Sequence, residues 1–221
     1  MRSNLIGMCS AVAAVAVAGS ANASLVFDNF QSAQNVVATA AQQTNYSFNF
    51  AYAAPSPAFS GSRFLTANGY WAGPPEQASQ VNVGGGTATL EVGGSGNFTS
   101  FLTYAPATAA DLTNFVFTVT VSSATGTGAT LEMSLSNGGT VARALTGAGT
   151  YSFAVSEFSG PSFNPASVSS ILLVLRTGLA SAGATNASAT LTSFNYSIIP
   201  APGAVALLGA AGLVGMRRRK A

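Results

Sequence analysis

Apolar and polar residues alternate with a period of two along much of this chain. Between residues 115 and 121, phenylalanine and valine at the odd positions alternate with Val116, Thr118 and Thr120. This period is that of a strand with one face turned to a core and the other to water. Ile171–Leu175 is apolar throughout, which predicts a strand covered on both faces. Similar runs predict strands at Leu25–Phe30, Tyr46–Ala51, Gln80–Val83, Thr87–Val92, Phe98–Tyr104, Leu131–Leu135, Tyr151–Val155 and Phe194–Ile198.

Glycine-rich turns separate these runs, at residues 84–86, 93–96, 125–128 and 137–139. Ser32–Gln43 is rich in Ala and Gln and is expected to form either one short helix or a loop. Ser56–Pro75 contains several prolines and is expected to be a long irregular connection. About ten short strands joined by such turns predict an all-β fold, a jelly-roll-like β-sandwich, with a closed barrel as the alternative.

The first 23 residues have the three parts of a secretory signal peptide. Arg2 supplies a positive start, and Leu5–Ala18 is apolar and uncharged. Ala21 and Ala23 give the small-x-small pattern that signal peptidase requires, so cleavage is expected before Ser24. The alternative is a first transmembrane helix, which the short length of the apolar stretch disfavours.

The last 22 residues form three blocks. Pro200, Ala201, Pro202 and Gly203 make a hinge that a regular helix does not continue through. Ala204–Met216 is uncharged and predicts a short transmembrane helix, with a buried core helix or a frayed tail as the alternative. The chain then closes on the basic cluster Arg217, Arg218, Arg219 and Lys220, which favours the cytoplasmic side of a membrane.

The string IPAPGAVALLGAAGLVGMRRRK resembles the PEP-CTERM sorting signal of Gram-negative bacteria. The resemblance implies export through the Sec translocon, an inner-membrane intermediate, and removal of the tail by an exosortase-type enzyme. Ala201 stands where the family's eponymous motif has Glu. Residues 145–198 also resemble the later half of the jelly-roll domains that occur in PEP-CTERM proteins and in carbohydrate-binding modules, and residues 26–30 and 61–65 resemble the start of such domains.

Charge is scarce and unevenly placed. Charged residues make up 6% of the chain, against about 25% in ordinary domains. Ser24–Ile199 holds three arginines against six carboxylates, a net charge of −3, so the basic patch of a nucleic-acid-binding protein is missing. The same segment contains neither Cys nor His, which excludes disulfides, thiol chemistry and imidazole bases there.

Few residues are candidates for chemistry. No sequence pattern pairs two carboxylates as a glycosidase requires, and Glu91 and Glu132 are expected on the solvated faces of strands. Asp28, with Asn29, could ligate a structural calcium ion or could cap a turn. Tyr70 and Trp71 follow an Asn-Gly pair and could form an exposed sugar-binding platform, or Trp71 could plug the core.

Three functions follow from these observations. The first is an exported, non-enzymatic β-sandwich (residues 24–199) between a signal peptide (1–23) and a sorting tail (200–221). Signal peptidase, the translocon and an exosortase-type enzyme would be its partners, and its role at the cell surface or in the extracellular matrix would be structural or adhesive. The second is a carbohydrate-binding module, with polysaccharide as partner. The third is a glycoside hydrolase or lyase. No cofactor is required by any of them.

Overall fold

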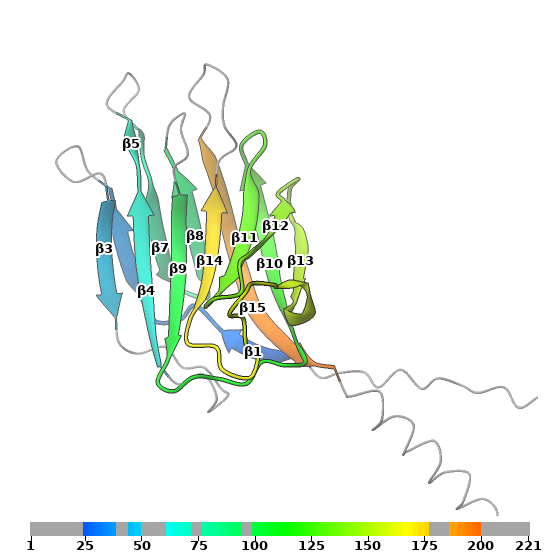
Figure 1. The fold of residues 1–221 in the computed structure, drawn as a ribbon. Coiled ribbons are helices and arrows are strands. Elements are labelled where there is room, and N and C mark those ends of the chain that lie inside the picture. Colours follow the sequence, from blue (N-terminus) through cyan, green and yellow to red (C-terminus); the bar gives the residue numbers. More distant parts are fainter. Residues whose placement is uncertain are drawn as a thin grey trace, which may run out of the picture.

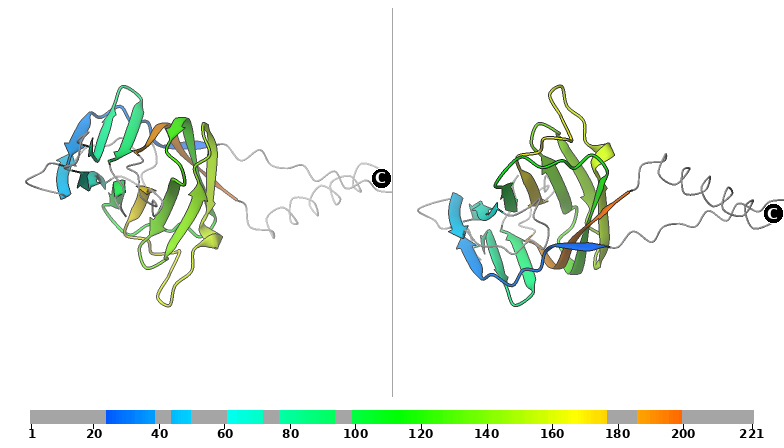
Figure 2. Two further views of the ribbon diagram at one scale, coloured as in Figure 1. Left: turned by 90° about the horizontal axis from the view of Figure 1, so that it is seen from above. Right: turned by 90° about the horizontal axis from the view of Figure 1, so that it is seen from below.

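The computed structural model describes residues 24–38, 44–49, 61–71, 77–93, 99–176 and 186–199. These residues form two antiparallel sheets that face each other as the layers of a β-sandwich (Figures 1 and 2). Apart from a three-residue 3-10 turn, η2 (Val155–Glu157), every named element in these ranges is a strand. None of the described residues belongs to a helix that is long and apolar enough to cross a membrane. The prediction of an all-β sandwich is therefore confirmed.

Seven strands form the first sheet, in the order β13-β10-β15-β8-β7-β2, with β1 also paired to β15. They are β1 (Leu25–Asp28), β2 (Gln34–Val37), β7 (Gln80–Gly84), β8 (Thr87–Val92), β10 (Phe115–Thr125), β13 (Gly149–Ala154) and β15 (Ala187–Ile198). Because Leu25 pairs with Tyr196, the two ends of the described domain lie side by side at one end of the sandwich (Figure 1).

Six strands form the second sheet, in the order β12-β11-β14-β9-β4-β3. They are β3 (Thr44–Asn49), β4 (Gly61–Asn68), β9 (Thr99–Pro106), β11 (Thr130–Leu135), β12 (Thr140–Ala144) and β14 (Ile171–Arg176). A separate two-stranded hairpin pairs β5 (Tyr70–Trp71) with β6 (Gln77–Ala78). From β8 to β15 the chain crosses repeatedly between the two sheets, in the manner of a jelly roll.

The core lies between the sheets and is filled by the inward positions of the alternating strands. Phe117, Val119 and Val121 of β10 are buried, whereas the threonines between them are half-buried, as the period of two predicts. Phe27 of β1 packs against Phe194 of β15, with ring centroids 4.5 Å apart. Aromatic rings in such contacts add about 0.5–1.5 kcal/mol per pair beyond the apolar area that they bury.

The largest fully buried side chain in the described residues belongs to a charged residue, Arg63 of β4. Its Nη1 donates to Asp28 Oδ2 at 2.7 Å, its Nε donates to Gln34 Oε1, and its Nη2 donates to the Ser32 carbonyl. Tyr104 Oη also donates to Asp28 Oδ2, at 3.0 Å. Since Asp28 and Gln34 belong to the first sheet and Arg63 and Tyr104 to the second, this buried network joins the two layers.

A second ion pair closes the free edge of β13. Arg143 of β12 donates through Nε to the Ser152 carbonyl at 3.0 Å and pairs through Nη2 with Glu157. Glu157 in turn accepts from the Ala154 backbone amide at 3.0 Å through Oε1. Edge strands present unpaired backbone groups that invite pairing with another chain. Here a carbonyl and an amide of the edge are both occupied by side chains.

Some expectations from the sequence are wrong. Ser32–Gln43 contains strand β2 rather than a helix, and Ser56–Pro75 contains strand β4 rather than only an irregular connection. Glu132 is not on a solvated face, because Arg176 Nε donates to its carboxylate at 2.9 Å and the residue is buried. The signal peptide, the cleavage residues Ala21 and Ala23, and the tail 200–221 lie outside the described residues, so these stay predictions.

Breaking the buried pair should cost much of the domain's stability. Asp28→Asn leaves the Arg63 guanidinium buried without its counter-charge, a loss of about 3–5 kcal/mol in the free energy of unfolding. Urea denaturation followed by tryptophan fluorescence measures it. The double variant Asp28→Leu with Arg63→Met should be less damaging, because no uncompensated charge remains inside. A loss below about 1 kcal/mol, the size expected for an exposed pair, would contradict this account of the network.

Acid should uncover the edge of β13. The hydrogen bond from Arg143, with that from the Ala154 amide, lowers the pKa of Glu157 from its ordinary value of 4.5. Because the pKa of Glu157 is lower in the folded than in the unfolded protein, the ion pair with Arg143 stabilises the domain fully above the unfolded-state pKa. This stabilisation is lost as the pH falls through the folded-state pKa. Light scattering should therefore detect self-association of the wild type only in acid, and of Arg143→Ala already at neutral pH. An Arg143→Ala protein that stays monomeric would contradict this.

Candidate functional site

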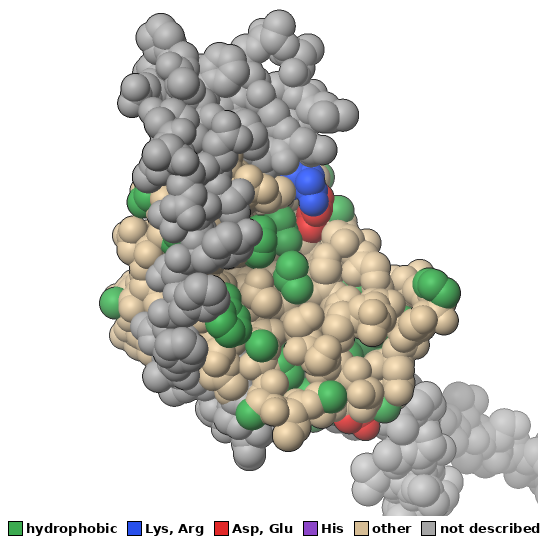
Figure 3. All heavy atoms as spheres, turned by 60° about the vertical axis from the view of Figure 1, so that its left-hand side comes forward, with side chains coloured by type: hydrophobic (Ala, Val, Ile, Leu, Met, Phe, Trp, Pro, Cys, Tyr) green, Lys and Arg blue, Asp and Glu red, His purple; other side chains and the backbone are tan. Residues whose placement is uncertain are grey.

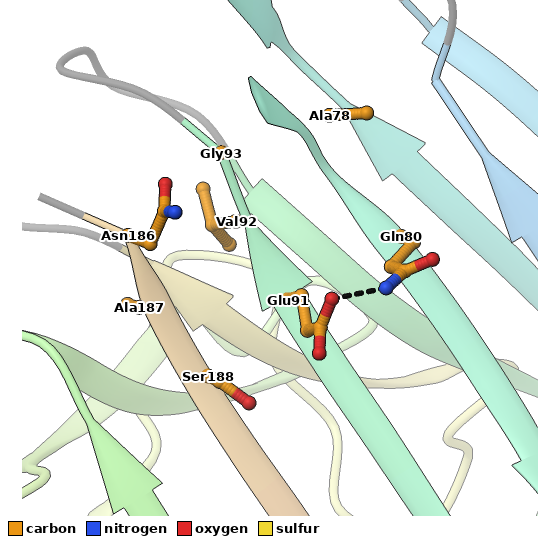
Figure 4. A pocket seen from close by; sticks show the side chains of 8 residues that line it. All are labelled: Ala78, Gln80, Glu91, Val92, Gly93, Asn186, Ala187 and Ser188. Atoms are coloured by element: carbon orange, nitrogen blue, oxygen red, sulfur yellow. Dashed lines mark hydrogen bonds between the residues drawn. The ribbon is translucent and has the colours of Figure 1, made fainter. Parts of the chain in front are cut away.

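A shallow groove lies at the end of the first sheet farthest from the chain's two described termini. Its volume is about 380 Å³, and it is lined by Ala78, Gln80, Glu91, Val92, Gly93, Asn186, Ala187 and Ser188 (Figure 4). Six of these residues belong to β6, β7, β8 and the start of β15, while Gly93 directly follows β8 and Asn186 directly precedes β15. The domain's amino-terminal and carboxyl-terminal ends are at the opposite end, where β1 pairs with the last residues of β15.

Three polar residues form a row across the floor of the groove. Gln80 pairs with Glu91, and Glu91 pairs with Ser188, so the three lie on adjacent strands in register. Their chain neighbours Val81 and Leu90 are buried, which places Gln80, Glu91 and Ser188 on the outer face of the sheet. Gln80 Nε2 donates to Glu91 Oε2 (Figure 4). Gln80 is thereby oriented with its amide oxygen directed away from Glu91.

Ser79, which is fully buried, holds the β5–β6 hairpin beside this groove. Its backbone amide donates to the Gly69 carbonyl at 3.0 Å, and its hydroxyl donates to the Asn68 carbonyl at 3.1 Å. The same hydroxyl accepts from the amide of Gly93 at 3.2 Å, at the wall of the groove. Ser79 therefore fixes the connection from β4 to β5 and the end of β8 to each other.

The pairing of β5 with β6 places the backbone of the predicted aromatic pair, Tyr70 and Trp71, beside the groove. Tyr70 pairs with Ala78, a residue that lines the groove, and Trp71 pairs with Gln77. The side chains of Tyr70 and Trp71 are not among those that the structure describes, so the alternatives of platform and core plug stay open. The strand pairing shows that β5 runs alongside the groove, rather than elsewhere on the sandwich.

The outer face of the sheet continues the groove with hydroxyl groups. Thr89 Oγ1 lies 3.5 Å from Thr190 Oγ1, and Ser193 Oγ donates to Thr120 Oγ1 at 2.9 Å. Figure 3 shows another face of the molecule, on which charged side chains of described residues also appear only in small spots. On the outer face of the first sheet, hydroxyl groups thus stand at positions where an ordinary domain carries charged side chains.

Other carboxylates in the described residues are placed away from the groove. The pKa of Asp111 lies below its ordinary value because Thr113 donates to it through both its hydroxyl and its backbone amide. Glu132 and Glu157 are ion-paired with arginines. Glu91 alone, among the described carboxylates, lines the groove. A pair of carboxylates facing each other across it is not found in the described residues.

The turn-capping alternative for Asp28 is confirmed, because Asp28 Oδ1 accepts from the Phe30 amide at 2.8 Å. Asn29 Oδ1 likewise accepts from the amide of Gln31, at 3.2 Å. The Arg63 guanidinium and the Tyr104 hydroxyl occupy the other oxygen of Asp28. A calcium ion there would have to displace these donors, and the described residues contain no group of three or more His, Cys, Asp or Glu side chains that could hold a metal ion. The arrangement gives the calcium prediction no support.

Gln80 and Ser188 were missed as site residues by sequence reasoning. They stand 108 positions apart, and nothing in either local sequence marks them as more than polar positions in a strand. Their relation arises from the pairing of β7 with β8 and of β8 with β15. The alternation of apolar and polar residues around Glu91 correctly places this side chain on the outer face of its strand, and it is the one indication of the site in the local sequence.

No protein-family model and no curated protein matches the chain. Among solved structures it is similar to CtCBM11, with a TM-score of 0.39 and 8% identity over 83% of this chain and 99% of that one. A family 11 carbohydrate-binding module of Clostridium thermocellum gives a TM-score of 0.35 and 9% identity over 81% and 97%. An exo-β-agarase gives 0.38 and 10% over 80% of this chain and 25% of that one.

Proposed function

We propose that this protein is an exported, non-enzymatic carbohydrate-binding protein of the cell surface or extracellular matrix, and that the groove beside β5 is its binding site. One observation carries the proposal. The groove places the row Gln80, Glu91 and Ser188 next to the strand that bears Tyr70 and Trp71. Sugar sites combine polar groups that hydrogen-bond hydroxyls with aromatic surface that contacts the ring, and β5 supplies the aromatic residue types beside the polar row.

The position of the groove supports a role outside a membrane. Strand β15 runs from Ala187 in the groove to Ile198, next to the segment that resembles a sorting signal. At about 3.3 Å per residue, its twelve residues separate the two by roughly 35 Å. A domain held by its tail would therefore present the groove away from the membrane, toward matrix polysaccharide.

The carboxylates support binding over hydrolysis. Glycosidases need two carboxyl groups about 5–10 Å apart across the substrate. In the described residues Asp28, Glu132 and Glu157 are each engaged with an arginine, and Glu91 has no second carboxylate beside it. The described residues of the groove thus offer one carboxylate and no second one to act with it as acid and base, which favours binding of a sugar over its hydrolysis.

Filling the groove should weaken binding. Ser188→Tyr introduces a bulky side chain on its floor and should weaken polysaccharide binding at least about tenfold, the effect of losing about 1.4 kcal/mol of contact. Thr150→Tyr, exposed on β13 of the same sheet, is the matched control and should bind as the wild type does. A glycan array read with the full chain in mild detergent, with Trp71→Ala alongside, measures both. Equal binding by Ser188→Tyr and the wild type, or no glycan bound by any variant, would overturn the proposal.

Sorting is the second part of the proposed function. Residues 204–216 would halt export in the membrane, and Arg217–Lys220 would hold the end on the cytoplasmic side until an exosortase-type enzyme removes the tail. Replacing the four basic residues with Ser should let the tail pass through the membrane, so that unprocessed protein appears in the medium. Replacing the three arginines with Lys preserves the charge and should leave sorting intact. If the serine variant is arrested and processed normally, this mechanism fails.

A further inference from the structure

Every arginine in the described residues is already paired with one carboxylate. Arg63 pairs with Asp28 at 2.7 Å, Arg176 pairs with Glu132 at 2.9 Å, and Arg143 pairs with Glu157. Lysine does not occur between residues 24 and 199. The described part of the domain therefore has no cation left over to neutralise a further carboxylate.

Glu91 is the carboxylate in the groove that these pairs leave unneutralised. One of its oxygens accepts from the uncharged amide of Gln80, and no ion pair involves it among the described residues. Its side chain is half-buried on the outer face of β8, where a ligand in the groove reaches it. A cationic donor adds the attraction between opposite charges to the hydrogen bond that a carboxylate accepts.

We propose that the groove selects polysaccharides that carry protonated primary amines, such as amino sugars without their N-acetyl groups. This inference rests on the proposed carbohydrate-binding function and names the ligand class of that site. An ammonium group on the sugar donates to Glu91, while the hydroxyl of Ser188 and the amide oxygen of Gln80 pair with sugar hydroxyls. Uronic acid polymers are disfavoured, because their carboxylates would face Glu91 without an intervening cation.

The surroundings of Glu91 favour an ammonium group over a calcium ion. Calcium takes six to eight oxygen ligands, usually with several carboxylates among them. Glu91 is the only carboxylate that lines the groove among the described residues, and its partner Gln80 presents an amide nitrogen to it. One negative charge with hydroxyl and amide neighbours matches one amine on a polyhydroxylated ring.

The test compares three soluble oligosaccharides: a β-1,4-linked glucosamine hexamer, its N-acetylated counterpart, and a galacturonic acid hexamer. Calorimetry with the full chain in mild detergent, at a pH at which the amine is protonated, measures their affinities. We expect the glucosamine hexamer to bind about tenfold more tightly than the N-acetylated one, the effect of one charge-assisted hydrogen bond. Added salt should reduce this preference, because the groove is open to solvent.

Glu91→Gln keeps the shape of the side chain and its ability to accept from Gln80, and should bring the two affinities together. Asp111→Asn is the matched control, since it removes the same charge from an exposed carboxylate that has no ion pair and does not line the groove. It should retain the wild-type preference.

Each other outcome overturns the inference in a distinguishable way. Tight binding of both neutral and amino hexamers, unchanged in Glu91→Gln, would refute the selectivity and leave the carbohydrate-binding function standing. Equal weakening of both hexamers by Glu91→Gln would assign Glu91 a role without charge recognition. Displacement of the glucosamine hexamer by calcium ions would make the groove a metal site. Failure of the wild type to bind any of the three, with no glycan bound on the array, would remove the proposed function itself.

Discussion

The buried guanidinium of Arg63 is the interaction on which the arrangement of the two sheets depends. Moving such a charge out of water costs several kcal/mol, and only well-placed partners offset that cost. Asp28 and Gln34 come from the first sheet, and Arg63 itself comes from the second. The partners meet only when the layers are correctly registered, so the network stabilises one alignment of the sheets. An apolar contact of similar size would tolerate a small slip between the layers, because hydrophobic attraction is not directional.

The network around Arg63 also determines at which end of the sandwich the two described termini lie. Asp28 ends β1, and β1 pairs with the last part of β15, so the network fixes both described termini at one end. At the other end Ser79 joins the end of β4 to the end of β8 beside the groove. A long strand, β15, connects these ends. The described termini and the groove thus lie at opposite ends of the domain.

Scarcity of charge makes each remaining charge informative. Three arginines are engaged in ion pairs that serve the fold: Arg63 joins the layers, Arg143 covers an edge, and Arg176 pairs with Glu132 between neighbouring strands. Among the described residues, Glu91 and Asp111 take part in no ion pair, and of these two only Glu91 lines the groove. In a domain with an ordinary density of surface charge, a carboxylate without an ion pair would carry little meaning. Here it distinguishes the groove from the surrounding face of hydroxyl and amide groups.

The sequence predicts the strands with a clear period of two, such as residues 115–121, and the resulting all-β class. It could do so because alternation is local: each residue's phase follows from its neighbours along the chain. It did not identify β4, since the nearby prolines of Ser56–Pro75 suggested an irregular segment, nor the burial of Glu132. The groove and the partners of each charge become visible only in the folded domain. Both depend on which strands pair, and contacts between distant segments leave no local trace in the sequence.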